Sequence, residues 1–169
     1  SFMLENKFLG NKTKKGFYER TKQKDASGRR IKLGLNLSTL EYHPTQRVKL
    51  DSLSAAKQVD SLKAKVRTFC NDKYADCKGA QLVKRSLAGL FAYVSNRIPE
   101  IADHLYQIDD AMRAGFGWEL GPFETWDILG PQRIADAMRS ENIVPNQWVL
   151  DMLESGVSSF YKTENGARY

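Results

Sequence analysis

Cysteine and histidine are scarce in this sequence, and their scarcity excludes several kinds of site. The 169 residues include two cysteines, Cys70 and Cys77, and two histidines, His43 and His104. Two cysteines are too few for a disulfide scaffold, and their spacing lacks the short gap common in zinc sites. The histidines lie far apart in the sequence. We therefore expect no metal site, and two reduced thiols of the kind found in cytoplasmic proteins.

Long apolar runs and nucleotide-binding motifs are also missing. No run approaches the roughly 18 residues that span a bilayer. No charged segment followed by an apolar one opens the chain, so no signal peptide is expected. The sequence has neither a Gly-x-Gly-x-x-Gly turn after a strand nor a phosphate-binding loop, because Gly115, Gly117 and Gly121 are too widely spaced. These absences exclude a membrane span and a recognisable dinucleotide site.

Positive charge is concentrated near the start of the chain. Ten of the 26 Lys and Arg residues lie in 1–33, against three acids, whereas 34–169 is nearly neutral. Lys12, Lys14 and Lys15 flank a turn beside Phe17 and Tyr18, a mixture that can bind nucleic acid or a phosphorylated cofactor. A solvated hairpin is the commoner structure. The alternative function is a basic helical module for nucleic-acid or protein interaction, whose binding would weaken steeply with salt.

Apolar spacing predicts a mainly helical fold. Steps of three and four predict one helix over 51–69 and a second from about 75 to 97, which Pro99 ends or kinks. Because the pattern continues for two more turns, we expect one long kinked helix over about 75–106. A short helix over 109–114 should close at Gly115. Pro122 and Pro131 should begin two helices separated by Gly130, and a further helix over 147–154 should follow Asn146. Alternating residues over 31–37 predict one short extended segment.

The two ends of the chain resemble each other. Met3–Glu5 recurs as Met152–Glu154, and each copy is followed nine or ten positions later by Lys-Thr and then by a glycine. The Asn-Gly pair at 165–166 is a strong hairpin signal. We infer an internal repeat of a helix end plus a hairpin. With the Ser1-Phe2 start and a final strand, this pattern suggests an excised piece of a longer protein.

Five carboxylates crowd residues 109–127, and two explanations stay open. Paired acids could perform general acid–base chemistry. The commoner explanation is structural, since Asp109 can cap a helix and Glu124 stands in the first turn after Pro122, where the helix dipole favours an acid. Phe123 and Trp126, three positions apart, should share one apolar face. No Ser or Cys nucleophile is marked by the sequence.

Residues 94–130 carry the most specific motif. Val94-Ser95-Asn96-Arg97 is followed by the Ile-Asp-Asp-Ala-Met-Arg-Ala-Gly-Phe-Gly run of 108–117 and then by Gly-Pro-Phe-Glu at 121–124. This pattern resembles the C-terminal helical domain of the 3-hydroxyacyl-CoA dehydrogenase family over residues 3–20 and 82–169. The residues that match the family motif, which we take as structural, are Arg97, Asp109, Gly115, Gly121, Pro122, Phe123, Glu124, Asp127 and Gly130.

The resemblance implies a fold and a domain order. The fold class is all-α, with short extended hairpin arms. Larger members of the family carry the helical domain twice, after a dinucleotide-binding domain. We therefore expect 1–20 to be the tail of a preceding copy, 21–50 a linker and 51–169 a second copy. The sequence is most similar to that of bacterial members in which an enoyl-CoA hydratase domain follows the helical domain. In that case both catalytic domains, the dinucleotide-binding domain and the hydratase domain, would be missing from this chain.

The resemblance also implies an activity for the parent protein. The family oxidises 3-hydroxyacyl-CoA to 3-ketoacyl-CoA with NAD in fatty-acid β-oxidation, and its catalytic His and Glu belong to the absent dinucleotide-binding domain. This chain should therefore bind no NAD and no metal and should show no turnover, while serving as a scaffold, contacting acyl-CoA and allowing a homodimer. Asn96 matches an active-site Asn of single-copy members, and its amide either faces substrate or ties the long helix to a loop.

Overall fold

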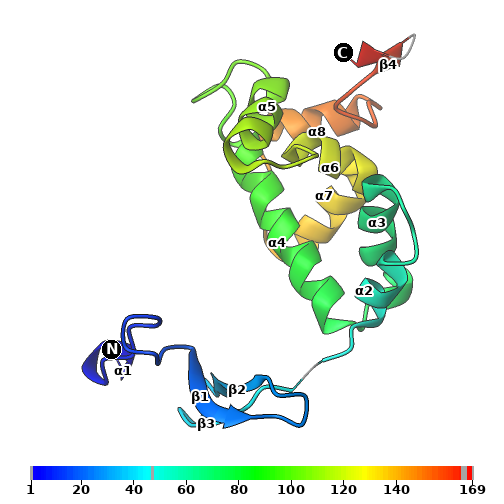
Figure 1. Ribbon diagram of the computed structural model, residues 1–169. Helices are drawn as coiled ribbons and strands as arrows, with labels where there is room; N and C mark the ends of the chain where they lie inside the picture. The colour runs from blue at the N-terminus through cyan, green and yellow to red at the C-terminus, as the bar shows by residue number, and fades with distance from the viewer. Residues whose placement is uncertain (1, 47, 165–166, 169) are drawn as a thin grey trace. The chain divides into compact units, whose positions relative to one another are not determined.

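The chain forms two separate compact units, Ser1–Val48 and Lys49–Tyr169. The structure is a computed structural model, and it describes residues 2–46, 48–164 and 167–168. Figure 1 shows the chain by residue number. The boundary between the units falls just before the first helix of the second unit. The specific motif of residues 94–130 therefore lies wholly within the second unit.

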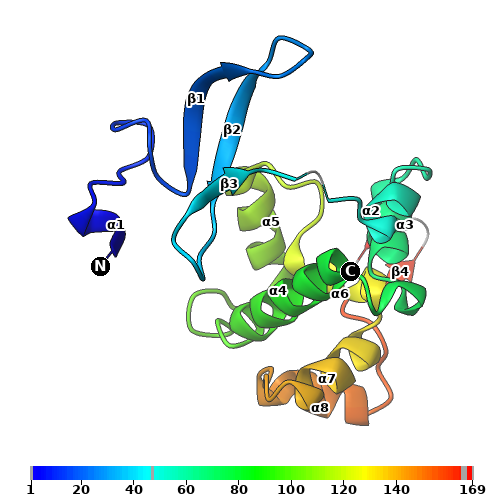
Figure 2. The ribbon, with the colours of Figure 1, turned by 90° about the horizontal axis from the view of Figure 1, so that it is seen from below.

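The first unit is a short helix followed by a small antiparallel sheet. Helix α1 (Phe2–Glu5) precedes β1 (Tyr18–Lys24), β2 (Arg30–Leu35) and β3 (Tyr42–Pro44), which pair in the order β1-β2-β3. Asp25 closes the β1–β2 turn, since its carboxylate accepts hydrogen bonds from the backbone of Ser27 and Arg29. Figure 2 shows β1 and β2 as the two long strands of this sheet. The extended segment expected over 31–37 is largely β2, and the three strands take up less than half of the expected linker 21–50.

The second unit is helical. A long helix, α4, runs beside a group of shorter helices (Figure 1). The fold class expected from the sequence, mainly helical with short extended arms, is confirmed. The elements in chain order are α2 (Asp51–Ala56), α3 (Leu62–Phe69), the 3-10 helix η1 (Asp72–Tyr74), α4 (Lys78–Ser95), α5 (Leu105–Phe116), α6 (Pro122–Leu129), α7 (Pro131–Ser140), α8 (Gln147–Glu154), β4 (Thr163–Glu164) and β5 (Ala167–Arg168).

The helix starts and stops expected for 122–156 are confirmed. Pro122 and Pro131 are the first residues of α6 and α7, where a missing backbone N–H costs nothing. Gly130 separates these two helices with φ +89°, a backbone angle that disfavours side chains. The Asn146 side chain accepts a hydrogen bond from the Trp148 N–H and caps α8.

Two expected helices are wrong in extent because each is broken by a local cap. The helix expected over 51–69 is interrupted at 57–61, where the Ser61 hydroxyl accepts a hydrogen bond from the Ala64 N–H and starts α3. The long helix expected over 75–106 ends at Ser95, because Pro99 cannot donate a helical hydrogen bond. A new helix, α5, starts at Leu105, where the Gln107 side chain accepts from the His104 N–H.

The helix expected over 109–114 is a part of α5 and does not end at Gly115. It continues to Phe116, and Gly117 ends it in the left-handed region at φ +66°. Gly115 lies inside the helix, and a Cβ built on it would have nothing within 4 Å. The structure therefore offers no packing or backbone reason for glycine at position 115.

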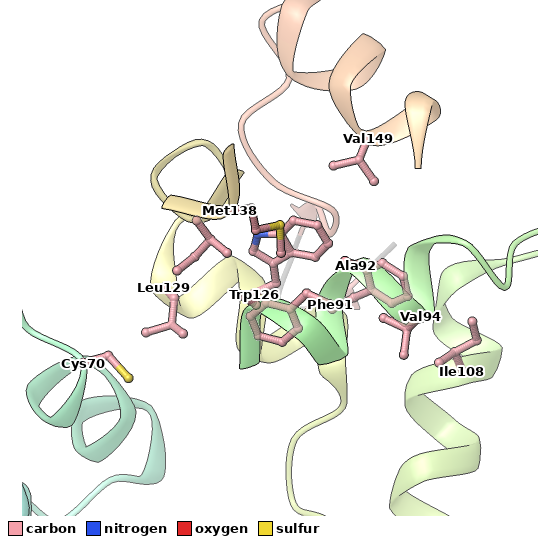
Figure 3. Packing of buried hydrophobic residues seen from close by; sticks show 12 residues of the cluster. Cys70, Phe91, Ala92, Val94, Ile108, Trp126, Leu129, Met138 and Val149 are labelled. Atoms are coloured by element: carbon pink, nitrogen blue, oxygen red, sulfur yellow. The ribbon is translucent and has the colours of Figure 1, made fainter. Parts of the chain in front are cut away.

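A continuous apolar core joins α4, α6, α7 and α8. Phe91, Phe123, Trp126, Met138 and Val149 all have 0% of their surface exposed. The Phe91 and Trp126 rings stack with centroids 5.1 Å apart. Figure 3 shows Phe91, Trp126 and Met138 packed together at the centre of this cluster. Burying each large side chain stabilises the fold by about 1.5–3 kcal/mol, and the shared apolar face expected for Phe123 and Trp126 is confirmed.

The repeat found in the sequence extends to the backbone. At the end of α1 the Phe8 N–H donates to the Met3 carbonyl at 2.8 Å, and at the end of α8 the Val157 N–H donates to the Met152 carbonyl at 3.2 Å. The residue before each donor, Lys7 or Gly156, has positive φ. Both ends thus share the same left-handed helix cap. The Asn165-Gly166 turn lies outside the described residues, although β4 and β5 on either side of it pair antiparallel.

Candidate functional site: a buried polar joint

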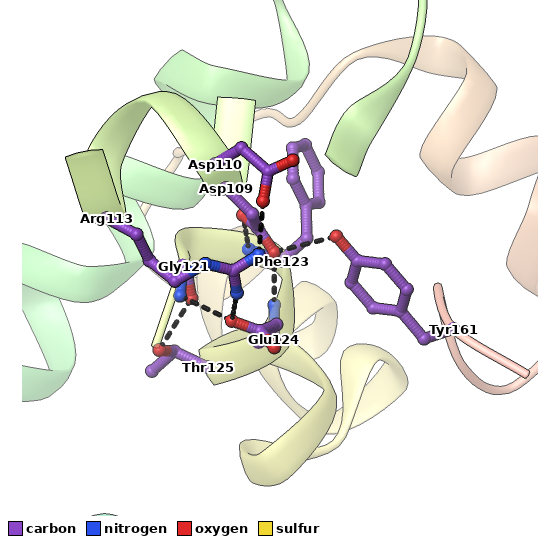
Figure 4. Close-up of polar contacts among 8 residues, drawn as sticks. All are labelled: Asp109, Asp110, Arg113, Gly121, Phe123, Glu124, Thr125 and Tyr161. Atoms are coloured by element: carbon purple, nitrogen blue, oxygen red, sulfur yellow. Dashed lines mark hydrogen bonds and ion pairs between the residues drawn. The ribbon is translucent and has the colours of Figure 1, made fainter. Parts of the chain in front are cut away.

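The family-motif residues of α5 and α6 meet at a buried carboxylate. Asp109 of α5 has 0% exposure and accepts hydrogen bonds from the backbone N–H groups of Phe123 at 2.9 Å and Glu124 at 3.0 Å. It also accepts one from the Tyr161 hydroxyl at 2.9 Å (Figure 4). The first N–H groups of any helix lack partners within that helix. Asp109 therefore caps α6, although Asp109 itself belongs to the neighbouring helix α5.

Gly121 is required by the closeness of this carboxylate. A Cβ built on Gly121 would lie 2.2 Å from Cγ of Asp109, which is far inside van der Waals contact. Its φ of −75° is ordinary, so the requirement is one of space alone. The glycine lets the turn before α6 approach α5 closely enough for Asp109 to reach two backbone donors. Gly121 and Asp109 thus form one structural unit.

Glu124 and Arg113 complete the polar group. The Glu124 carboxylate accepts from the Gly121 N–H at 2.7 Å and pairs with the Arg113 guanidinium. Arg113 also pairs with Asp110, one turn earlier on α5. Figure 4 shows the guanidinium between the two carboxylates. Glu124 is only 6% exposed, so its charge is neutralised where it is buried.

Asp127 of α6 connects the segment 160–161 to that helix. Its carboxylate accepts from the Phe160 N–H at 2.7 Å and from the Tyr161 N–H at 3.1 Å. The Phe160 ring packs against Trp126 with centroids 4.9 Å apart. Tyr161 is thereby held where its hydroxyl reaches Asp109. The acids of the motif therefore connect α5, α6 and the segment 160–161, and we name this group of Asp109, Arg113, Gly121, Glu124, Asp127 and Tyr161 the α5–α6 joint.

Burial sets the electrostatics of the joint. Desolvation raises the pKa of Asp109, although the hydrogen bonds from Phe123, Tyr161 and Glu124 oppose it. Burial, with the nearby negative charge of Asp109, also raises the pKa of the Tyr161 hydroxyl far above its ordinary value. The phenol therefore stays protonated and acts as a donor. The pKa of Arg113 is raised first by its hydrogen bond to Asp110, so this side chain stays charged.

Asn96 and Arg97 belong to a second group at the end of α4. The exposed Asn96 amide donates to the Ala92 carbonyl at 2.8 Å, and its oxygen accepts from the Asn146 side chain at 3.4 Å. Arg97 pairs with Glu100 at 2.6 Å and lies over the Tyr93 ring. Asn96 thus touches the start of α8 through Asn146.

Ser95 is the residue of this second group that sequence reasoning missed. It is completely buried, and its hydroxyl accepts from the Asn146 N–H at 2.9 Å. Its carbonyl accepts from the Trp148 indole N–H at 3.1 Å. Ser95 therefore fixes the end of α4 to the start of α8. A serine directly before the Asn-Arg pair, on the apolar side of the helix, is the signal that could have indicated it.

The two cysteines occupy different environments. Cys70 is buried, and desolvation raises its pKa. Cys77 directly precedes α4, and its sulfur lies 3.3 Å from the Ser52 hydroxyl. That hydrogen bond, with backbone N–H groups of α4, lowers the pKa of Cys77 to about 7. Among the described residues, no group of three or more His, Cys, Asp or Glu side chains could hold a metal ion.

The basic residues of the first unit are partly engaged with its own aromatic rings. The Lys15 amine lies 4.8 Å from the centre of the Phe8 ring and 4.7 Å from that of Tyr42. The Lys32 amine lies 3.7 Å from the centre of the Tyr18 ring. These lysines therefore make cation–π contacts with aromatic rings of the first unit itself. In the part of the chain that the structure describes, no helix is long and apolar enough to cross a membrane.

Comparison with curated proteins gives three clear relatives. A probable 3-hydroxyacyl-CoA dehydrogenase of Bacillus subtilis (strain 168) is 35% identical over 164 residues, which is 97% of this chain and 20% of the relative. Putative fatty acid oxidation complex trifunctional enzymes of Rickettsia prowazekii and Rickettsia felis are each 28% identical over 75% of this chain and 15% of their own length. The resemblance expected from the motif is confirmed, and the chain spans about a fifth of the Bacillus relative.

Two further comparisons add nothing to these relatives. No family model matches this chain. No solved structure matches it either.

Proposed function

We propose that this chain, whose curated homologues are a 3-hydroxyacyl-CoA dehydrogenase and fatty acid oxidation enzymes, is a scaffolding part of an NAD-dependent 3-hydroxyacyl-CoA dehydrogenase of fatty-acid oxidation. Residues 1–20 are the tail of one helical copy, 21–50 connect the copies, and 51–169 form a second copy. The relatives are much longer than this chain, which supports further domains in the parent protein. The shared cap at the ends of α1 and α8 supports the repeated copy.

The single observation that carries the scaffolding role is the α5–α6 joint. The acids of the motif, Asp109, Glu124 and Asp127, all accept hydrogen bonds from backbone N–H groups. Asp109 and Glu124 are also buried. A general acid or base must reach a substrate proton directly or through one water. Side chains committed in this way hold helices together, and they leave the chemistry to other parts of the protein.

The remaining assignments concern the parent protein. NAD binds to a dinucleotide-binding domain that is not a part of this chain, and acyl-CoA is the substrate of the whole enzyme. An enoyl-CoA hydratase domain is the second partner in a multifunctional arrangement, and the protein acts in the cytoplasm as a homodimer. This chain holds neither NAD nor a metal of its own.

A turnover assay tests the scaffolding role. The purified chain is incubated with NADH and acetoacetyl-CoA, and the absorbance of NADH is followed. We expect no change, because the sequence carries no dinucleotide-binding motif. Steady oxidation of NADH that scales with protein concentration, and that Asp109→Asn abolishes in a folded chain, would contradict the proposal.

A calorimetric titration with acetoacetyl-CoA tests whether Asn96 faces substrate. Asn96→Ala is compared with the unmodified chain and with Gln132→Ala, which truncates an exposed amide on α7. Binding that only Asn96→Ala weakens would give this copy a part of the substrate surface. If binding is absent, or equal in all three proteins, the role of Asn96 is to connect the end of α4 to Asn146.

A further inference from the structure

An open apolar hollow lies between α3 and α4. Both helices pack against α2 and α6, and the space that they leave between them measures about 540 Å³. Leu53 of α2, Val66 and Phe69 of α3, and Val83 and Leu87 of α4 form its wall. This volume falls in the range of roughly 300–1,000 Å³ that is usual for small-molecule sites. None of the residues of the α5–α6 joint lines it.

The hollow is lined almost entirely by apolar side chains. Leu53 is a part of this lining and keeps 40% of its surface exposed. Ala56 and the buried Cys70 close the inner side, and Thr125, the one uncharged polar residue of the lining, uses its hydroxyl on the Gly121 carbonyl. Apart from the two lysines at its rim, the wall therefore offers few hydrogen-bonding groups to a ligand. It favours a ligand portion that is a plain hydrocarbon.

Two cations stand at the rim of this apolar wall. Lys57, directly after α2, and Lys65 of α3 both line the hollow and are both exposed to solvent. Within the described parts of the chain, no ion pair involves either lysine. A ligand that fills the hollow would meet uncompensated positive charge at its entrance. Lysine acts toward such a ligand as a point charge that favours an anionic group.

We propose that this hollow binds the alkyl chain of an amphipathic anion, with the chain against α3 and α4 and the anionic head at Lys57 and Lys65. Free fatty acids and acyl-CoA thioesters share this chemistry. A neutral alkyl chain would leave the lysines unused, and a peptide would bring polar backbone groups to a wall that cannot satisfy them. The inference rests on the shape and charge of the hollow, and it does not depend on the proposed dehydrogenase role.

Titration of the chain with straight-chain carboxylates tests the site. Octanoate, decanoate and dodecanoate are compared by calorimetry below their micelle concentrations, with decanol as the neutral probe. Each added methylene that enters the hollow should tighten binding by about fourfold. Decanoate should bind more tightly than decanol. Decanoyl-CoA forms a further arm, because binding of the thioester alone would identify the source as acyl-CoA, and binding of both would identify the alkyl anion in general.

Matched variants locate the binding. Leu87→Trp fills the hollow from α4 and should abolish binding, whereas Leu82→Trp adds the same ring at a position of α4 that is 68% exposed and should not. Lys65→Glu should remove the preference for decanoate over decanol, and Lys63→Glu, an exposed position on α3 outside the hollow, should keep it. Circular dichroism establishes that each variant is folded.

Three results would overturn the proposal. The first is a folded chain that binds none of these ligands. The second is binding that Leu87→Trp leaves unchanged, which would place the ligand elsewhere. The third is a dimer that forms through the hollow, detected by light scattering and lost in Leu87→Trp but not in Leu82→Trp, since a second copy would then be its occupant. Failure of these titrations would leave the turnover assay on the dehydrogenase role unaffected.

Discussion

At the scale of single residues, the most specific motif of the sequence is explained by packing around one carboxylate. Gly121 lacks a side chain because Asp109 occupies the space where one would be, and Asp109 is buried because it caps α6. The sequence predicted that Asp109 can cap a helix, without indicating which helix, and the structure shows that it caps α6. The backbone N–H groups that Asp109 caps belong to α6, the next helix in the chain. Spacing within one element could not reveal it.

Two glycines of the motif should respond to alanine in opposite directions. Gly121→Ala places a Cβ against Asp109 and should destabilise the fold by at least 1–3 kcal/mol, roughly the cost of overpacking. Gly115→Ala lies in open space inside α5 and should stabilise by about 0.5–1 kcal/mol through helix propensity. Urea denaturation of both variants measures the two changes. Equal effects would show that the contact between Gly121 and Asp109 is not as described.

Asp109→Asn should reveal the cost of a buried charge through its pH dependence. The amide can accept from only one of the two backbone donors, so the variant should lose about 1–3 kcal/mol. Burial raises the pKa of Asp109 in the folded state, so the folded chain binds the proton more tightly than the unfolded chain does. The stability that this group contributes is complete below the unfolded pKa and is lost as pH rises through the folded one.

The measurement for Asp109→Asn is therefore a series of urea denaturation curves from acid to neutral pH. The stability difference between the unmodified chain and the variant should shrink as pH rises above the ordinary pKa of 3.8. Asp136→Asn, at an exposed position of α7, is the matched control and should show no such trend. A difference that grows with pH would mean that the hydrogen bonds at Asp109 outweigh its desolvation.

The two thiols should differ in their reaction with iodoacetamide. Cys77 has a pKa of about 7 because of Ser52 and the start of α4, whereas Cys70 is buried with a raised pKa. The thiolate is the reactive form, so alkylation of Cys77 should be half-maximal near pH 7 and should far outpace that of Cys70. Mass spectrometry of the labelled peptides measures both rates. Ser52→Ala should move the Cys77 profile to higher pH, and an unchanged profile would contradict the assignment.

At the scale of elements, the sequence was most informative where the stop and start signals are local. Pro122, Gly130, Pro131 and Asn146 each act through their own backbone or side chain, and the helices that they bound were predicted correctly. The break at 57–61 was missed, and the expected interruption at Pro99 was taken as a kink and not as the full break over 96–104, because the apolar spacing continues across both segments. The contact between Tyr161 and Asp109 joins residues too far apart in sequence for any periodic pattern to indicate.

Asp127 should control the order of the segment that follows α8. Its carboxylate accepts from the N–H groups of Phe160 and Tyr161, and no helix holds these amides. Asp127→Ala should raise the hydrogen exchange of both amides by about ten- to a hundredfold, as local opening becomes cheaper by about 1–3 kcal/mol. Hydrogen-exchange mass spectrometry of the 157–162 peptide measures it. Asp151→Ala, exposed on α8, is the control, and equal exchange in both variants would contradict the role.

At the scale of the whole molecule, the chain is two units whose combined length is about a fifth of the Bacillus relative. The motif of residues 94–130 lies in the second unit, and its acids hold helices together. The first unit carries the concentrated positive charge and a helix end whose cap repeats that of α8. The sequence predicted the repeat and the family. It could not predict the hollow between α3 and α4, because that space arises from how four helices pack.

The central claim is that this chain is an interchangeable scaffolding part of a 3-hydroxyacyl-CoA dehydrogenase. The most direct measurement replaces the aligned 164 residues of the Bacillus subtilis relative with this chain and follows NADH-dependent reduction of acetoacetyl-CoA. We expect the chimaera to keep this activity. The same chimaera with Gly121→Ala should lose thermal stability before it loses turnover at low temperature. A folded chimaera without activity, beside an active Bacillus enzyme, would contradict the account.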